Sequence, residues 1–91
     1  MRFVRVIVRG RVQGVGFRWF ARSMAQEHDV SGWVRNRPDG SVEAELCGTA
    51  DAVDAVLAAL RRGPAGAHVR TVESEDATGT PSAGFEIRPT D

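Results

Sequence analysis

The sequence predicts an α+β fold in which an antiparallel β-sheet carries two α-helices on one of its faces. Three observations lead to this prediction. Residues 2–9 place three valines on one face and an only partly polar set on the other (Arg5 and Arg9 with Phe3 and Ile7), as a strand with one well-buried face does. Two later segments, residues 17–25 and 53–60, instead repeat their apolar side chains at helical spacing. The turn Pro38-Asp39-Gly40 joins two further alternating segments into a hairpin.

The first strand and the first helix follow from these patterns. The strand is expected over residues 2–9, with Val4, Val6 and Val8 on its buried face. The helix is expected to begin at Phe17 and to end around residues 28–31. Its apolar stripe consists of Phe17, Phe20, Ala21, Met24 and Ala25.

The second half of the chain repeats this scheme. Strands are expected over residues 30–37 and 41–47, on either side of the turn. Thr49 is the expected N-cap of a second helix, which Gly63-Pro64 ends. A strand over residues 68–75 and a short closing strand over residues 85–88 follow. The stripe of the second helix is formed by Val53, Val56, Leu57 and Leu60.

The order strand, helix, strand, strand, helix, strand, with the short final strand, predicts a ferredoxin-like α/β sandwich built from two split βαβ units. We expect a single domain over residues 1–91, which is long enough to bury a core of its own. A helix separates the first two strands, so these strands should run parallel. The end of the first strand, the start of the first helix and the end of the second strand should therefore meet at one edge of the sheet.

The composition argues against several classes of function. Basic and acidic residues are equal in number, so no net charge attracts nucleic acid or an anionic membrane. Cys47 is the only cysteine, so neither an internal disulfide nor a cysteine-rich metal site is expected. No segment is of signal-peptide or membrane-spanning type. These features predict a soluble, cytoplasmic protein, and no cluster of metal-ligating residues suggests a bound metal.

The segment from residue 10 to residue 18 has the properties of an anion-binding loop. Three glycines, Gly10, Gly14 and Gly16, separate the first strand from the first helix, and Arg18 opens that helix. Glycine permits a loop in which several N–H groups converge, and the first N–H groups of a helix lack partners within it. An arginine there adds a planar fork that pairs with two phosphate oxygens. A tight turn followed by a surface arginine is the alternative interpretation.

Asn36 is expected at the same edge of the sheet. It is the only asparagine, it lies at the end of the second strand, and its position in the alternation matches that of Val30 and Val34. A neutral amide beside an arginine fork and loop N–H groups is suited to positioning a water molecule. The alternative is a turn residue that prepares the following Pro38-Asp39-Gly40 bend.

Residues 10–18 (GRVQGVGFR) and 32–36 (GWVRN), followed by Gly40, Val42 and Gly48, resemble the two signature segments of the acylphosphatases. The resemblance extends over nearly the whole chain. It implies metal-independent hydrolysis of the carboxyl–phosphate anhydride of acyl phosphates to a carboxylate and inorganic phosphate. Pro89, Thr90 and Asp91 extend beyond the point where many members of this family end, and the zinc-finger region of the larger hydrogenase-maturation proteins is absent.

The resemblance also implies roles for individual residues. Arg18 and Asn36 are the expected catalytic residues, with Asn36 orienting the attacking water. Inorganic phosphate is the expected product and inhibitor, and we expect a monomer. The phosphate is expected to be held by Arg18 and by the backbone of Gln13, Gly14, Val15, Gly16 and Phe17.

Other residues with reactive side chains carry weaker arguments. Cys47 as a phosphatase nucleophile requires an arginine six positions later, where Val53 stands, so a structural thiol is favoured. His28 and His68 are too far apart in the predicted fold to form a metal pair. Glu43 and Glu45 share a strand face and are expected to be solvated. Trp19 and Trp33 line either the rim of the site or the core, and Arg61 and Arg62 complement the negative end of the second helix.

Two binding modules of the same architecture remain as alternatives to an enzyme. RNA-recognition domains stack bases on aromatic side chains of the third strand, which here has none. A regulatory or small-ligand-binding module without catalysis is the stronger alternative, because the fold alone does not determine function. Release of phosphate from an acyl phosphate distinguishes the enzyme from both.

Overall fold

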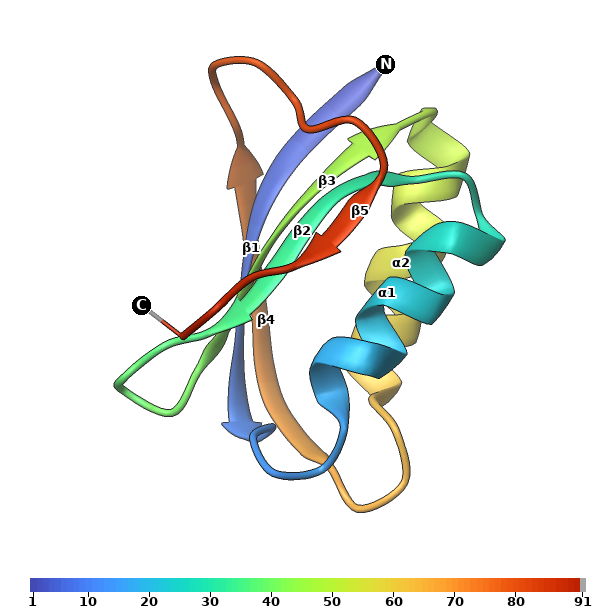
Figure 1. Cartoon of the computed structure of the whole chain (residues 1–91). Coiled ribbons are helices and arrows are strands. Elements are labelled where there is room, and N and C mark those ends of the chain that lie inside the picture. The colour runs from blue at the N-terminus through green and yellow to red at the C-terminus, as the bar shows by residue number, and fades with distance from the viewer. Residues whose placement is uncertain (91) are drawn as a thin grey trace.

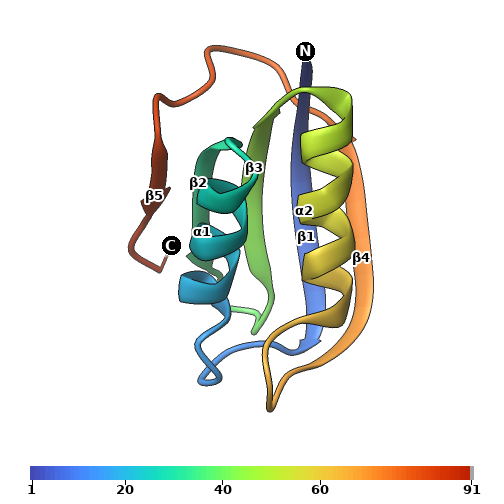
Figure 2. The same ribbon diagram turned by 90° about the vertical axis from the view of Figure 1, so that its right-hand side faces the viewer.

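The computed structural model describes residues 1–90 and contains one five-stranded sheet and two helices. The two helices lie side by side over one face of the sheet, and the other face carries no helix (Figures 1 and 2). This arrangement confirms the predicted ferredoxin-like sandwich. In chain order the elements are β1 (Arg2–Arg11), α1 (Phe17–Glu27), β2 (Ser31–Asn36), β3 (Val42–Gly48), α2 (Ala50–Arg62), β4 (His68–Asp76) and β5 (Phe85–Ile87).

The strand order across the sheet is β4-β1-β3-β2-β5. Neighbouring strands are antiparallel except β2 and β5, which pair in parallel at the edge. Because β1 and β2 are both antiparallel to the β3 strand between them, they point the same way, as the sequence predicted. Their C-terminal ends and the start of α1 therefore lie at one end of the sheet (Figure 1).

The core lies between the helices and the sheet and is made of the predicted apolar positions. Val4, Val6 and Val8 of β1 are at most 1% exposed. Full burial of such a side chain contributes about 1.5–3 kcal/mol. Phe20 and Met24 of the predicted stripe are only partly buried at its margin. The helix side chains facing the sheet are Phe17, Ala21, Ala25, Val53, Val56, Leu57 and Leu60.

The two helices differ at their N-termini, which matters for the site. In α2, the Oγ1 atom of Thr49 accepts a hydrogen bond from the N–H of Ala52 at 3.2 Å, as predicted. In α1, the N-cap is Gly16, whose lack of a side chain leaves the first N–H groups without a cap, and no acidic residue follows in the first turn. The positive end of α1 is therefore open to an external anion.

The structure corrects the expectation that Glu43 is solvated. Glu43 lies on the helix-free face of the sheet and is only 3% exposed, because two arginines from the neighbouring strands cover it. Its carboxylate accepts hydrogen bonds from Nε of Arg5 at 2.6 Å and Nε of Arg35 at 2.8 Å. Burial alone raises the pKa of Glu43, but the hydrogen bonds and positive charges of Arg35 and Arg5 outweigh burial and lower it below its usual value.

This ion pair gives a testable dependence of stability on pH. Because folding lowers the pKa of Glu43, the stabilisation is present above the unfolded-state pKa and is lost as the pH falls through the folded-state pKa. Replacing Glu43 with glutamine should reduce the free energy of unfolding at neutral pH by about 1–3 kcal/mol and should weaken the loss of stability in acid. Urea unfolding at neutral and acidic pH measures both effects.

The matched control is Glu73→Gln, which alters an exposed glutamate paired with Arg9 on the same face of the sheet. It should change the free energy of unfolding by no more than about 0.5 kcal/mol. Equal effects of the two substitutions would contradict a special role for the buried carboxylate.

The chain beyond β5 has no regular secondary structure where it is described. The closing strand covers residues 85–87, one residue less than predicted, and Pro89 and Thr90 after it are exposed. Asp91 lies outside the described residues. No helix within residues 1–90 combines the length and the apolar composition needed to cross a membrane.

Candidate active site

The loop between β1 and α1 presents backbone N–H groups that have no acceptor. Gly14 and Gly16 adopt φ angles of 74° and 75°, in the left-handed region that favours glycine. A Cβ atom at either position would meet nothing within 4 Å, so the backbone conformation and not crowding selects glycine there. Within the described chain, no N–H of residues 13–18 forms a hydrogen bond. These groups form the kind of loop that binds an anion.

Arg18, in the first turn of α1, is partly buried and has neither an ion pair nor a hydrogen bond within residues 1–90. Several other arginines have carboxylate partners, for example Arg5 with Glu43 and Arg88 with Glu86. The guanidinium of Arg18 is therefore available to an anion at the loop, which its planar fork suits better than an ammonium does.

Asn36 is the last residue of β2 and lies opposite Val42 of β3. Its Oδ1 atom is buried and has no hydrogen-bond partner. No other buried side-chain N or O atom of the described residues lacks a partner. An orphaned buried acceptor costs about 1–3 kcal/mol, so it is usually matched by a bound water or ligand. An amide oxygen in this state is suited to accept an O–H hydrogen bond from a water molecule.

The side chain of Gln13 has a role that the sequence analysis missed. Its Nε2 atom donates to the backbone oxygens of Arg37 and Ser41, both at 2.9 Å. These bonds tie the glycine loop to the β2–β3 turn, which begins directly after Asn36. Gln13 thus fixes the position of one half of the site relative to the other. No local sequence signal identifies this contact, because it depends on the packing of segments that are distant in the chain.

The β2–β3 turn is itself held by several hydrogen bonds. The N–H of Arg37 donates to the oxygen of Ser41 at 2.9 Å, and the N–H of Gly40 donates to the oxygen of Arg37 at 3.1 Å. Asp39 Oδ1 accepts from both the hydroxyl and the N–H of Ser41, which lowers the pKa of this carboxyl. The rigid turn fixes the backbone next to Asn36.

The topology thus brings the predicted site residues to one end of the sheet. Residues 13–17 and Arg18 lie in the loop that leaves β1 and in the first turn of α1, and Asn36 ends β2 (Figure 1). Val8 of β1 and Asn36 of β2 are both paired with Val42 of β3, the strand between them. Asn36 therefore lies level with the last part of β1, from which the glycine loop continues.

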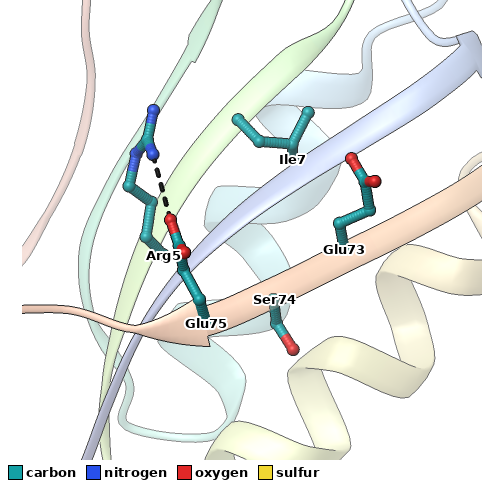
Figure 3. A pocket seen from close by; sticks show the side chains of 5 residues that line it. All are labelled: Arg5, Ile7, Glu73, Ser74 and Glu75. Atoms are coloured by element: carbon teal, nitrogen blue, oxygen red, sulfur yellow. Dashed lines mark hydrogen bonds and ion pairs between the residues drawn. The ribbon is translucent and has the colours of Figure 1, made fainter.

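One concave region lies away from this site. A pocket of about 240 Å³ opens over β1 and β4 on the helix-free face. Figure 3 shows Arg5 and Glu75 hydrogen-bonded at one side of this pocket and Glu73 at the other. Its two carboxylates make it unsuitable for a phosphoryl group. Its lining residues are Arg5, Ile7, Glu73, Ser74 and Glu75.

The other reactive side chains are not part of this arrangement. Cys47 is buried within β3, at the end of that strand far from the loop. His28 caps the C-terminus of α1, whereas His68 begins β4 at the opposite end of the sheet. Within residues 1–90, no three metal-ligating side chains of the His, Cys, Asp or Glu type lie close enough to share an ion.

The two tryptophans occupy different environments. Trp33 is buried on the helix-free face, where its Nε1 atom donates to Glu45 at 3.0 Å and the guanidinium groups of Arg35 and Arg88 lie over its ring. Packing therefore accounts for Trp33. Trp19 is 59% exposed on α1, next to Arg22, so the core does not account for it.

Comparison with known proteins identifies the family of the chain. The family model described as Acylphosphatase matches residues 4–87. A curated acylphosphatase of Azoarcus sp. (strain BH72) is 52% identical over 83 residues, covering 91% of this chain and 85% of that relative.

The solved structures give the same result. The crystal structure of acylphosphatase from Bacillus subtilis superposes with a TM-score of 0.91 at 35% identity, covering 97% of this chain and 99% of that one. The crystal structure of T. kodakarensis HypF superposes with a TM-score of 0.83 at 29% identity and covers 100% of this chain, but only 12% of the longer HypF chain is matched. The chain belongs to the acylphosphatase family.

Proposed function

We propose that the protein hydrolyses acyl phosphates to a carboxylate and inorganic phosphate at the site formed by the loop, Arg18 and Asn36. The observation that carries this proposal is the presence, at one end of the sheet, of unpaired loop N–H groups together with the buried, unpartnered Oδ1 atom of Asn36. The loop N–H groups are complementary to a phosphoryl group. The Oδ1 atom of Asn36 is complementary to the water that attacks this phosphoryl group.

The bound substrate is held at its phosphoryl end. The N–H groups of residues 13–17 and the guanidinium of Arg18 donate to the phosphoryl oxygens, and the uncapped N-terminus of α1 adds its partial positive charge. Phosphoryl transfer depends mostly on positioning and on stabilising charge at these oxygens. Removal of one such donor commonly reduces turnover by about 10²–10³-fold.

The attacking water is held by Asn36. One O–H of the water donates to Oδ1 of Asn36, which leaves an oxygen lone pair directed at phosphorus. A bond forms between this oxygen and phosphorus while the bond from phosphorus to the acyl oxygen breaks, and the electron pair leaves with the carboxylate. One proton of the water moves to a phosphoryl oxygen, and the other stays on the oxygen that has bonded to phosphorus. The leaving carboxylate is stable as an anion, so no strong general acid is required.

The remaining parts of the proposal concern the molecule as a whole. The chain acts as one acylphosphatase domain and as a monomer, in the cytoplasm. It uses no metal or other cofactor. Inorganic phosphate, which resembles the bound phosphoryl group, is both product and inhibitor.

Hydrolysis should require neither a metal nor the thiol of Cys47. The charge on the phosphoryl oxygens is stabilised by arginine and N–H donors, and Cys47 is buried within β3. Phosphate release from acetyl phosphate should therefore be unchanged by excess chelator and changed less than about twofold by Cys47→Ala, with folding checked by circular dichroism. A large loss of activity in either experiment, with the fold intact, would contradict the proposal.

A further inference from the structure

Arginines gather at the end of the molecule that carries the candidate site. This arginine end comprises the end of β1, the β2–β3 turn, the start of β4 and the adjacent ends of both helices (Figure 2). A Cβ atom added at Gly63, the C-cap of α2, would lie 3.4 Å from the ring of Phe17 at the start of α1, so the end of α2 lies beside the start of α1. Besides Arg18, the sheet and turn contribute Arg9, Arg11, Arg37 and Arg70 to this end, and the last turn of α2 contributes Arg61 and Arg62.

These arginines are mostly unneutralised. Two carboxylates lie against this end, both close to Arg9: Asp39 at 3.5 Å and Glu73 at 3.2 Å. Asp39 also attracts the charge of Arg37. Apart from Arg9, none of the arginines just named has an ion pair within residues 1–90. Several arginines elsewhere are matched by carboxylates: Arg2 pairs with Asp54, and Arg5 and Arg35 both pair with Glu43.

The acidic residues gather at the opposite end. Glu27 ends α1, Asp51 and Asp54 lie in the first half of α2, and Asp76 ends β4 opposite Val4. The formal net charge is zero, yet the charge is separated along a molecule 31 Å in its longest dimension. The equal totals of basic and acidic residues therefore conceal a strongly positive surface around the site.

We propose that the arginine end attracts anionic substrates to the site over a long range and favours acyl phosphates whose acyl part carries a further negative charge. This inference rests on the proposed function of the site. Clustered like charges raise the local concentration of an oppositely charged ligand and its rate of association. The attraction increases with the total charge of the ligand, so an acyl phosphate with a free carboxylate gains more than a simple one.

The proposal is tested with a pair of variants that carry the same net charge. Arg61→Gln/Arg62→Gln removes two positive charges from the arginine end without altering a residue that contacts the phosphoryl group. Thr78→Glu/Thr80→Glu adds two negative charges to the exposed β4–β5 loop at the other end, where the N–H of Ala77 bonds to the oxygen of Phe3. Calorimetric titration with inorganic phosphate gives the dissociation constant for each variant at several salt concentrations.

At an ionic strength of about 10 mM, where the screening length is about 30 Å, the arginine double variant should bind phosphate about threefold more weakly than the unaltered protein. At about 0.15 M, where that length is about 8 Å, the difference should fall below about 1.5-fold. The phosphate dissociation constant of the threonine double variant should stay within about 1.5-fold of that of the unaltered protein at both ionic strengths. Arg70→Gln removes one charge from the same end and should cause a smaller, salt-dependent loss of phosphate affinity. Because Arg70 lies on β4, this loss cannot result from a change in the stability of α2.

Kinetics test the preference among substrates. The ratio of kcat/KM for succinyl phosphate, which keeps a free carboxylate, to kcat/KM for acetyl phosphate should decrease in the arginine double variant and remain unchanged in the threonine double variant. Equal changes in the two double variants, or no change in the arginine variant at low salt, would overturn the attraction while leaving the site intact. Phosphate binding that does not depend on Arg18 would overturn the proposed function itself.

Discussion

Replacing Arg18 with alanine should lower kcat/KM for an acyl phosphate by at least about 10³-fold while the protein stays folded. Arg18 forms no ion pair or hydrogen bond within residues 1–90, so its charged end stabilises no other part of the described chain. Its loss therefore removes a charged donor from the phosphoryl group. Arg18→Lys should also be poor, because an ammonium cannot reproduce the planar two-pronged contact.

Ligand-induced stabilisation separates this role from a structural one. Inorganic phosphate at a tenfold excess over its dissociation constant should stabilise the unaltered protein by about 1.4 kcal/mol, and should stabilise Arg18→Ala much less. Arg22→Ala is the matched control, since Arg22 lies one turn further along α1 and stacks on Trp19. Thermal unfolding with and without phosphate measures all three proteins. Equal stabilisation of the unaltered protein and Arg18→Ala would place the anion site elsewhere.

Replacing Asn36 with alanine should lower kcat by about 10²–10³-fold but leave the phosphate inhibition constant nearly unchanged. The water contact is made on the reaction path, whereas the phosphate is held by Arg18 and the loop, so the loss appears in kcat. Because Oδ1 of Asn36 is buried without a partner, its removal should not lower the free energy of unfolding. A large loss of stability would show that Asn36 is structural.

Asn36→Asp tests whether the water requires only an acceptor. The substitution keeps an oxygen at the same place but adds a negative charge beside an anionic phosphate. Positioning by a neutral amide predicts low turnover and weaker phosphate inhibition, because the two anions repel each other. Steady-state kinetics of the unaltered protein and both variants distinguish the cases. If alanine weakens phosphate inhibition as much as Arg18→Ala does, Asn36 is a phosphate ligand. If aspartate retains full activity, the carboxylate is an adequate substitute and the assigned role of the amide is wrong.

The fold was largely predictable because local patterns and long-range packing agree in this chain. The alternation of Val4, Val6 and Val8 and the stripe on α2 identify the same core from the sequence that the structure shows. The parallel pairing of β5 with β2 was not predicted, because the loop from residue 77 to residue 84 sets its direction and carries no periodic signal.

The sequence was sufficient to predict which segments form the site, but not which contacts their side chains make. The glycines and Arg18 are adjacent in sequence, and the parallel course of β1 and β2 follows from the intervening helix, so the junction could be located. The burial of Glu43 depends on arginines from two other strands, at positions 5 and 35, and the loop–turn bonds of Gln13 depend on packing. The orphaned oxygen of Asn36 likewise depends on the surroundings of its side chain and not on the residue type.

The measurement that tests the mechanism most directly is hydrolysis of acetyl phosphate in water enriched in heavy oxygen, with both products analysed by mass spectrometry. Attack by a water held at Asn36 on a phosphoryl group held at Arg18 predicts one heavy oxygen in the released phosphate and none in the acetate. The rate should exceed that of Arg18→Ala and Asn36→Ala under the same conditions. Heavy oxygen in the acetate would mean that water attacks the carbonyl carbon. Phosphate release no faster than in buffer without the protein would mean that the site is not catalytic.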